Sequence, residues 1–370
     1  MIELNQATSI LLYINIVLLG TFSMYLAYRY HSMSKVFIIV TICIFAIPAM
    51  FRYDVGIDYV QYIPVVNIIG NNSSLSRALM FTYKEPTLGI IFYFASSIFK
   101  NIRVGFSIYA LSTQILFILS CWKYRKIAKP YISVFMYGCL YYYGTYNTFR
   151  QALAIAIVIW GLEYLLNKRY VQYLICVVIA TSFHYSALIS LVLLFYFNLS
   201  KEGKQKTAFK SYVVPTVCAL FITQLIPLVR YIPILSVYAK SYIRDYNFTS
   251  MFTAGTILEV YITLGYIYYR KRSKVSKAIN TVQEAVLDKA FYCHELFYVL
   301  GFLLGDIQRI GQYFFVPYIF SVAVMCSTNS VNRWKVPAGK LIGFSYAALI
   351  LLSQVAQGYF GIMPYKFWMP

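Results

Sequence analysis

The sequence predicts an all-α fold, a polytopic integral membrane protein, and two observations lead to that prediction. The first is composition, because 60% of the 370 residues are hydrophobic and only 12% are charged, whereas soluble domains average about a quarter charged residues. The second is that apolar runs recur from residue 9 to residue 357. The stretches between these runs are too short for an independent soluble domain. We therefore expect one integral-membrane domain over residues 1–370.

A membrane-spanning helix needs about 20 predominantly apolar residues, and this template predicts about twelve transmembrane helices. The predicted spans cover residues 9–28, 35–51, 104–122, 131–146, 149–167, 170–183, 185–199, 210–229, 253–270, 290–305, 309–327 and 340–357. The first span lacks a basic leading segment and a small-residue cleavage site. It is therefore expected to be a retained helix rather than a signal peptide.

The basic residues predict how these helices are oriented. A formal charge of +20 would also suit nucleic acid, but most of the Lys and Arg residues lie in short loops between apolar runs. These loops cover residues 29–35, 123–129, 168–169, 201–210, 270–289 and 333–340. The positive-inside rule assigns such loops to the cytoplasmic side, and all six lie there if both termini are outside. We therefore expect the membrane, and no nucleic acid, as a partner.

The same rule predicts how two short apolar segments are placed in the membrane. A full span over residues 87–99 would place the basic loop 123–129 outside, so we expect a re-entrant or interfacial helix there. A single helix over 170–199 would move the basic loop after it outside, so we expect two short spans with an external turn at His184. The predicted outer side also carries a long loop from Arg52 to Pro86.

Several familiar kinds of site are missing from the sequence. None of the seven cysteines pairs with another at metal-ligand or redox-motif spacing. There is no zinc-site spacing of His and carboxylate residues, no Gly-rich nucleotide loop and no Gly-x-Ser-x-Gly elbow. We expect no metal ion, no cofactor and no cytosolic nucleotide as substrate.

Ionisable residues at the ends of apolar runs are the main indication of function. Seven of them can be placed on the outer face: Arg52, Asp58, Glu85, Arg150, His184, Asp306 and Arg309. Such groups near the membrane point to function when they face a cavity.

Two of these residues, Arg52 and Asp58, directly follow the predicted span 35–51, and Arg150 lies at the start of the predicted span 149–167. The planar fork of arginine binds phosphate through paired charge-assisted hydrogen bonds, and Gly56 would allow a tight turn that brings Asp58 near Arg52. The alternative for that pair is a salt bridge that closes a helix end. Arg150 lies at a helix N-terminus, where the dipole opposes a cation, so an anionic ligand explains it better than lipid headgroups do.

The remaining outer residues have two interpretations each. Glu85 precedes Pro86 and could simply cap a helix, or it could act as a catalytic carboxylate. His184 can serve as base, acid or donor to phosphate, although a lone histidine is more often structural. Arg309 either pairs with Asp306 three residues earlier or is a third cation around a diphosphate.

Taken in order, these motifs resemble the EpsG-like family of Wzy-type polysaccharide polymerases. The resemblance rests on Arg52-x-x-x-Gly56-x-Asp58-Tyr59-x-x-Tyr62, Glu85, Phe149-Arg150-Gln151-x-Leu153-Ala154, Ala180-x-x-Phe183-His184-x-Ser186-Ala187, and Arg309 with Tyr313-Phe314. Ile57 departs from the pattern, since the family often has a small hydroxyl residue there. The resemblance implies polymerisation of undecaprenyl-diphosphate-linked oligosaccharide repeats on the outer face of the cytoplasmic membrane. It also implies a flippase and a chain-length regulator as partners.

The residue chemistry suits an inverting, metal-independent glycosyl transfer, the stereochemistry coming from the family analogy alone. Cations would hold the leaving diphosphate, and a carboxylate or imidazole would accept a proton from the acceptor hydroxyl. The expected cations are Arg52, Arg150 and Arg309. We expect Asp58 or Glu85 as the general base and His184 as a group that orients phosphate or acceptor.

Two other classes of protein remain open. A polysaccharide transporter or flippase would bind the lipid-linked glycan through the same arginines without chemistry. Glu163, Glu259 and Glu295 lie inside predicted spans and would suit a proton path, but they fall at different depths, which argues against a transporter. A membrane acyltransferase that modifies glycans would use His184 as its base.

Overall fold

The computed structural model describes residues 1–71, 74–198, 253–272, 281–301, 305–327 and 337–368. The chain divides into two compact units, Met1–Leu191 with Ala347–Pro370, and Val192–Tyr346, and each is described by itself. The regular secondary structure of the described residues is helical apart from one two-stranded antiparallel ladder, which confirms the all-α prediction for this part of the chain. The expectation of one integral-membrane domain stays a prediction.

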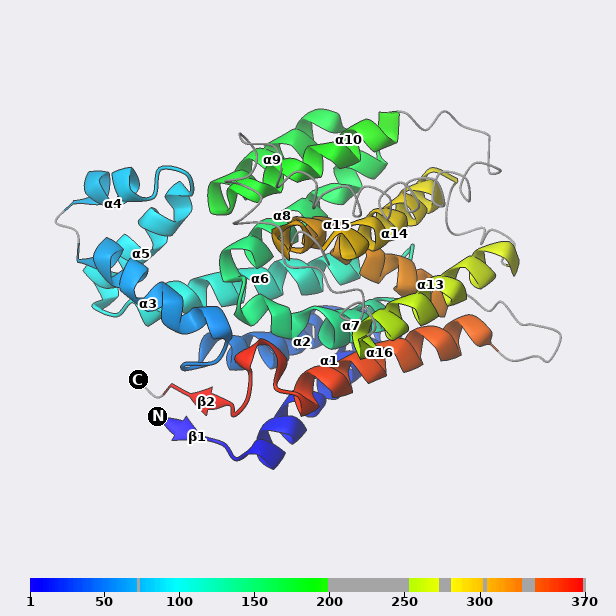
Figure 1. The fold of residues 1–370 in the computed structure, drawn as a ribbon, viewed down its shortest axis with the longest axis horizontal. Coiled ribbons are helices and arrows are strands. Elements are labelled where there is room, and N and C mark those ends of the chain that lie inside the picture. Colours follow the sequence, from blue (N-terminus) through cyan, green and yellow to red (C-terminus); the bar gives the residue numbers. More distant parts are fainter. Residues whose placement is uncertain (72–73, 199–252, 273–280, 302–304, 328–336, 369–370) are drawn as a thin grey trace, which may run out of the picture. The chain divides into compact units, whose positions relative to one another are not determined.

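The first unit contains these elements in chain order: β1 (Ile2–Glu3), α1 (Gln6–Arg29), η1 (His31–Met33), α2 (Ser34–Met50), α3 (Ile57–Gly70), α4 (Leu75–Phe81), α5 (Pro86–Phe99), α6 (Arg103–Lys123), α7 (Pro130–Leu140), η2 (Tyr142–Tyr146), α8 (Phe149–Leu166), α9 (Tyr170–Phe183), η3 (Tyr185–Ser190), the end of α16 (Ala338–Ala356), η7 (Tyr359–Gly361) and β2 (Lys366–Phe367). Within it α1 packs on α2 and α7, α6 packs on α2 and α8, and α9 packs on α8. The short helix α5 contacts α3, α4, α6 and α9. Helix α5 therefore connects the short helices α3 and α4 to the longer helices of the unit (Figure 1).

The two chain ends meet at one end of this unit. Strand β1 pairs with β2, with Ile2 opposite Phe367, and the N and C labels lie next to each other in Figure 1. The backbone N–H of Trp368 donates to the carbonyl of Phe51 at 2.7 Å, just beyond the end of α2. The hydroxyl of Tyr13 near the start of α1 donates to the carbonyl of Ile362 at 2.6 Å. These bonds hold both termini at the same end of the unit as the C-terminal end of α2.

Six described helical segments are long and apolar enough to cross a membrane: Gln6–Arg29, His31–Met50, Arg103–Lys123, Phe149–Leu166, Arg309–Ser327 and Ala338–Ala356. Four shorter apolar helices cover Pro86–Phe99, Pro130–Leu140, Tyr170–Phe183 and Tyr185–Leu194. The predicted span 210–229 lies outside the described residues. The count of twelve crossings is therefore not confirmed.

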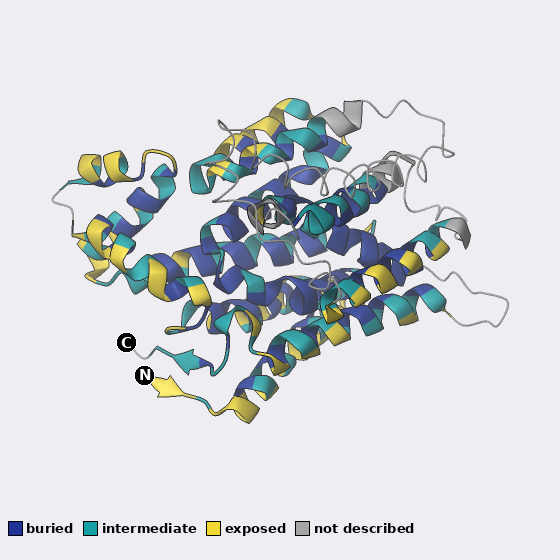
Figure 2. Cartoon of the chain, viewed as in Figure 1, coloured by how far each residue is buried: buried dark blue, intermediate teal, exposed yellow. Residues whose placement is uncertain are grey.

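The prediction of a long loop between Arg52 and Pro86 is wrong, because this segment folds into α3 and α4. The buried residues of α3 are Tyr59, Val66 and Ile69, whose spacing of seven and then three places them on one helical face. A helix of this length spans roughly 21 Å, less than the hydrocarbon core of about 30 Å. A template of about 20 apolar residues therefore overlooks it. Figure 2 shows that much of α3 and α4 is exposed, whereas α8 is mostly buried.

The segment 131–146 also differs from its predicted single span. The α-helix ends at Leu140, and the chain continues as the 3₁₀ helix η2. Its tyrosines turn inward and hydrogen-bond: the hydroxyl of Tyr142 donates to the carbonyl of Phe45 at 2.7 Å, and that of Tyr143 to the carbonyl of Tyr13 at 2.6 Å. Buried hydroxyls need hydrogen-bond partners. The 3₁₀ helix η2 brings these hydroxyls to the backbone carbonyls of the neighbouring helices. In contrast, the predicted break at His184 between two short helices is confirmed, because α9 ends at Phe183 and His184 is extended, with φ −154° and ψ 118°. Its position on the outer side stays a prediction.

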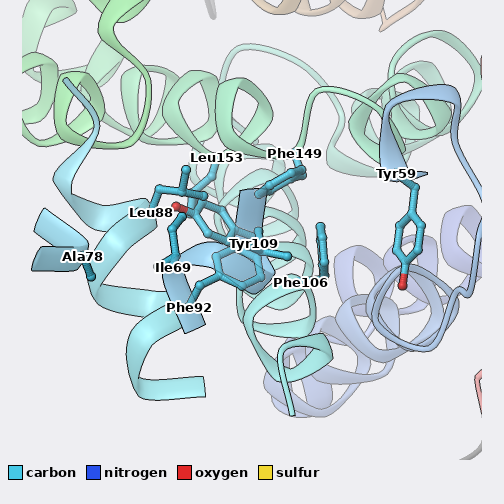
Figure 3. Close-up of a cluster of buried hydrophobic side chains, with 10 residues drawn as sticks. Tyr59, Ile69, Ala78, Leu88, Phe92, Phe106, Tyr109, Phe149 and Leu153 are labelled. Carbon is cyan, nitrogen blue, oxygen red and sulfur yellow. The ribbon is translucent and has the colours of Figure 1, made fainter. Parts of the chain in front are cut away.

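A cluster of aromatic and aliphatic side chains joins the peripheral helices to α6 and α8. It consists of Tyr59, Val66, Ile69, Ala78, Leu88, Phe92, Phe106, Tyr109, Phe149 and Leu153. Figure 3 shows the rings of Phe92, Phe106, Tyr109 and Phe149 gathered between the helices. The Tyr109 and Phe149 rings meet edge to face, with centroids 4.9 Å apart. Phe149 is the first residue of α8, so this packing fixes where α8 begins.

The second unit contains most of α10 (Leu191–Asn198), α13 (Ala254–Arg272), α14 (Thr281–Gly301), α15 (Gly305–Ser327) and the first part of α16. Helix α14 begins well before residue 290, the predicted start of its span, and so extends into the segment predicted as the basic loop 270–289. Asp288 accepts hydrogen bonds from Arg270 and Tyr266, both at 2.7 Å. Helices α14 and α15 pack together, and the Phe297 ring stacks on Phe314 with centroids 5.0 Å apart.

Candidate active site

Glu85 lies at the centre of a polar cluster in the first unit. It is the N-cap residue of α5, with Pro86 at the first helical position, and its side chain is 7% exposed. One carboxylate oxygen pairs with Nη1 of Arg150 at the start of α8, and the other pairs with Nδ1 of His184 between α9 and η3. Three residues far apart in the sequence, each at a helix end, are therefore in direct contact.

The contact fixes which nitrogen of His184 carries a proton. A carboxylate accepts hydrogen bonds and donates none, so Nδ1 of His184 donates to Glu85. In the neutral imidazole, the other nitrogen, Nε2, then has a free lone pair. His184 is thus arranged as a base backed by a carboxylate.

Glu85 is ionised at neutral pH. Burial raises the pKa of its carboxyl group. The hydrogen bond from His184 and the positive charge of Arg150 lower the pKa, and their effect outweighs that of burial, so the pKa lies below its usual value. A hydrogen bond from the backbone of Tyr185 acts in the same direction. The carboxylate therefore keeps its negative charge next to the imidazole.

Arg150 is held on two sides. Besides its ion pair with Glu85, Nη2 donates to the hydroxyl of Tyr62 on α3 at 3.0 Å, and the guanidinium lies 4.9 Å from the centre of that ring. The dipole of α8 opposes a cation at this position, and the sequence predicts an anion to offset it. In the folded chain, Glu85 is such an anion.

Two further residues that the sequence did not single out help to build the cluster. The Thr87 hydroxyl donates to the carbonyl of Ser182 at 2.7 Å, which ties the start of α5 to the end of α9. Tyr109 is fully buried against Phe149 and Phe183, with ring centroids 4.9 and 6.0 Å away. Tyr109 lies inside an apolar run without a charged neighbour in sequence, whereas Thr87 follows Glu85 by two residues, the one sequence signal that could have pointed to it.

Arg52 lies outside this cluster and is engaged elsewhere. It is 5% exposed, and it donates to the backbone carbonyls of Ala49 at 3.1 Å and Tyr146 at 3.0 Å. Its guanidinium lies 4.6 Å from the centre of the Tyr146 ring. Arg52 closes a helix end, as one interpretation of the sequence has it, but through carbonyl groups rather than through Asp58. It also fixes the segment that leads into α8.

Gly56 and Asp58 lie in the short segment that joins Arg52 to α3 and at the start of that helix. Gly56 has φ +109°, and a Cβ atom there would lie 2.8 Å from Oδ1 of Asn147 and 3.1 Å from the carbonyl oxygen of Tyr146, so glycine is required by both conformation and space. Asp58 follows in the first turn of α3, where a carboxylate suits the helix dipole. It is half-buried and forms no hydrogen bond or ion pair with the part of the chain that the structure describes.

Arg309 belongs to the second unit, where it is exposed on α15. The side chain of its predicted partner Asp306 lies outside the described residues. The role of Arg309 as a further cation beside Arg150 therefore stays a prediction. Within the described ranges, no three His, Cys, Asp or Glu side chains lie close enough together to hold a metal ion.

The family model of the EpsG family matches residues 35–367, and the chain therefore belongs to the EpsG family. This confirms the resemblance found in the motifs. No curated protein and no solved structure matches the chain. Family membership and the apolar helices together make the chain a multi-pass membrane protein of polysaccharide biosynthesis.

Proposed function

We propose that this protein is a glycosyltransferase that polymerises undecaprenyl-diphosphate-linked oligosaccharide repeats on the outer face of the cytoplasmic membrane. The observation that carries the proposal is the contact of Glu85 with both His184 and Arg150. It combines a base, the carboxylate that orients the base, and a cation at a helix N-terminus. Glycosyl transfer from a lipid diphosphate needs such a set.

The acceptor is activated at His184. The attacking hydroxyl of the acceptor sugar gives its proton to Nε2, while its oxygen bonds to the anomeric carbon of the donor sugar. The bond from that carbon to the diphosphate oxygen breaks, and its electron pair leaves with the diphosphate. Glu85 stays ionised throughout and stabilises the imidazolium that forms. In this proposal His184 is the base and Glu85 orients it, which removes the need for Asp58 as a base.

The leaving diphosphate develops its charge near Arg150. The positive end of the α8 dipole lies at the same place, and both favour an anion. Arg309 remains the proposed second cation. Arg52 contributes by holding the segment before α8 through its bonds to Ala49 and Tyr146, and not by binding phosphate.

Charge placement within the first unit supports an outward-facing site. Arg150 is at the start of α8 and Glu163 is near its end, and 13 residues of helix separate them by roughly 20 Å. Glu163 pairs with Lys123 at 2.7 Å, at the end of α6 next to the basic loop 123–129. If that loop is cytoplasmic, the cluster around Glu85 is on the other side of the membrane.

Substitution of Glu85 by Gln tests the proposal in cells. Glu85→Gln keeps the shape of the side chain but removes the charge, so we expect polymer to be lost and single lipid-linked repeats to accumulate outside. The matched control is Asp54→Asn, since Asp54 is an exposed acid whose ion pair with Lys366 measures 3.4 Å and which lies outside the cluster. At equal protein level this control should leave polymer length unchanged.

The same experiment separates the other classes of protein. Unchanged polymer length in the Glu85→Gln strain at equal protein level contradicts the proposal. Repeats that accumulate on the cytoplasmic side point to a flippase. Loss of acetyl groups with chain length preserved points to an acyltransferase.

A further inference from the structure

The second unit contains a buried polar cluster that the proposed reaction does not use. Four helices contribute to it: Glu259 comes from α13, His294 and Glu295 from α14, Tyr318 from α15 and Tyr346 from α16. Each of these residues is at most 8% exposed. In sequence the two acids fall at different depths of their predicted spans, but in the structure Nε2 of His294, the residue directly before Glu295, lies 4.0 Å from Oε2 of Glu259.

Two tyrosine hydroxyls hold the Glu259 carboxyl group. The hydroxyl of Tyr346 donates to Oε1 at 2.7 Å, and that of Tyr318 lies 3.4 Å from Oε2 and 3.0 Å from the Tyr346 oxygen. These bonds fix the carboxyl group in place but supply no positive charge. Among the described residues the nearest basic group is the imidazole of His294, with Nε2 at 4.0 Å from Oε2.

Two polar atoms at the cluster lack a hydrogen-bond partner in the described part of the chain. They are Nε2 of His294, which points at Glu259, and Oε1 of Glu295. Such buried atoms normally have partners, and leaving them without one is costly. Their presence around a pair of acids indicates that the cluster binds something small and positively charged.

The charge balance leads to the same conclusion. Another buried acid on α14, Asp288, pairs with Arg270 at 2.7 Å, whereas no Lys or Arg of the described ranges pairs with Glu259 or Glu295. Two buried carboxylates in one cluster, without a Lys or Arg partner among the described residues, would be strongly disfavoured by desolvation and by mutual repulsion. At least one of them must therefore carry a proton or hold a cation.

We infer that Glu259 and Glu295, with His294, form a proton-binding site inside the second unit. One proton is shared by the two acids, as in other pairs of neighbouring carboxyl groups. The groups that face the pair include the hydroxyls of Tyr318 and Tyr346, the imidazole of His294 and the hydroxyl of the buried Thr263 beside Glu295. No three His, Cys, Asp or Glu side chains lie close enough here or elsewhere among the described residues to hold a metal ion, and a proton needs no such set of ligands.

A hydrophobic carbodiimide tests this inference on the purified full-length protein. Dicyclohexylcarbodiimide reacts with a carboxyl group that is protonated and surrounded by apolar groups, and it remains attached as an N-acylurea that peptide mass spectrometry can locate. We expect labelling of Glu259 or Glu295 near neutral pH, falling as the pH rises and the shared proton leaves. Glu163, which pairs with Lys123 at 2.7 Å, should stay unlabelled under the same conditions. It is an internal control that requires no variant.

Single variants show whether the two acids act as a pair. In Glu295→Gln the repulsion on Glu259 disappears, so the pH at which labelling of Glu259 is half-maximal should move down by about one unit or more. An unshifted midpoint would overturn the shared proton. Absence of labelling on both acids in the wild type would overturn the site. Protection of the acids by sodium chloride but not by choline chloride would identify a sodium site instead and contradict proton binding.

Discussion

At the scale of single residues, the carboxylate of Glu85 decides what the site can do. It pairs with Arg150 and His184, which holds the guanidinium in place and leaves Nε2 of the imidazole free to accept a proton. The sequence singled out all three residues, because each lies at the end of an apolar run. Their contact was not predictable, since 65 residues separate Glu85 from Arg150 and 99 separate it from His184.

The pKa of Glu85 leads to a prediction for stability. Its pKa in the folded protein is lower than in the unfolded chain, so the ionised carboxylate stabilises the fold at neutral pH. This contribution should be complete above about pH 5 and lost as the pH falls through the lowered pKa. The difference in Tm between wild type and Glu85→Gln, measured in detergent, should shrink on acidification. A difference that is constant down to about pH 3 would contradict the ionised state.

Gly56 leads to a second prediction at this scale. Substitution Gly56→Ala forces an L-residue into φ +109° and brings its Cβ to 2.8 Å from Oδ1 of Asn147, so we expect a loss of about 1–3 kcal/mol in stability. The control is Gly144→Ala, where the nearest atom would be 3.9 Å away. Thermal unfolding in detergent measures both. An equal Tm for the two variants would refute the steric argument.

At the scale of elements, the helix ends near the site were predicted better than the helices around it. The end of α9 before His184 and the start of α8 at Phe149 agree with the predicted spans 170–183 and 149–167, because the apolar runs stop there. Helices α3 and α4 were missed because they are too short to span a membrane. They nevertheless supply Tyr62, which contacts Arg150.

The bond between α5 and α9 is open to a direct test. Thr87→Val removes the hydrogen bond to the carbonyl of Ser182, so Glu85 and His184 are held together less firmly. A typical hydrogen bond contributes about 1 kcal/mol, and we expect the rate of polymer formation to fall about fivefold. Thr181→Val is the matched control, because the Thr181 hydroxyl bonds within its own helix to the carbonyl of Val177 at 2.8 Å. Equal rates for the two variants would show that the bond does not position the site.

At the scale of the whole molecule, the predicted family and the predicted helical membrane protein are confirmed, whereas the number of crossings is not. The positive-inside rule assigns sides to loops but cannot show which apolar segments are complete spans. Both units contribute residues that the sequence singled out, with Glu85 in the first and Arg309 in the second. The sequence pattern alone could not show that Arg52 is buried against backbone carbonyls, because its partners are main-chain atoms.

Cysteine accessibility tests the sidedness on which the outer-face proposal depends. Ile57 is 59% exposed at the start of α3, and Ile57→Cys should react in intact cells with a maleimide that cannot cross the membrane. Lys126 is exposed in the predicted cytoplasmic loop, so Lys126→Cys should react only after permeabilisation. Wild type supplies the background of the native cysteines. The reverse pattern would place the Glu85 cluster in the cytoplasm.

The most direct test of the central claim is the rate of polymer formation by purified protein from lipid-linked repeats. Glu85→Gln, His184→Gln and the double variant should be compared with wild type. General base catalysis contributes on the order of 10²–10⁴-fold, so we expect each single variant to lose activity on that scale. Because Glu85 acts through His184, the double variant should be no slower than the His184→Gln variant. Losses that multiply in the double variant, or near-wild-type rates in His184→Gln, would contradict the mechanism.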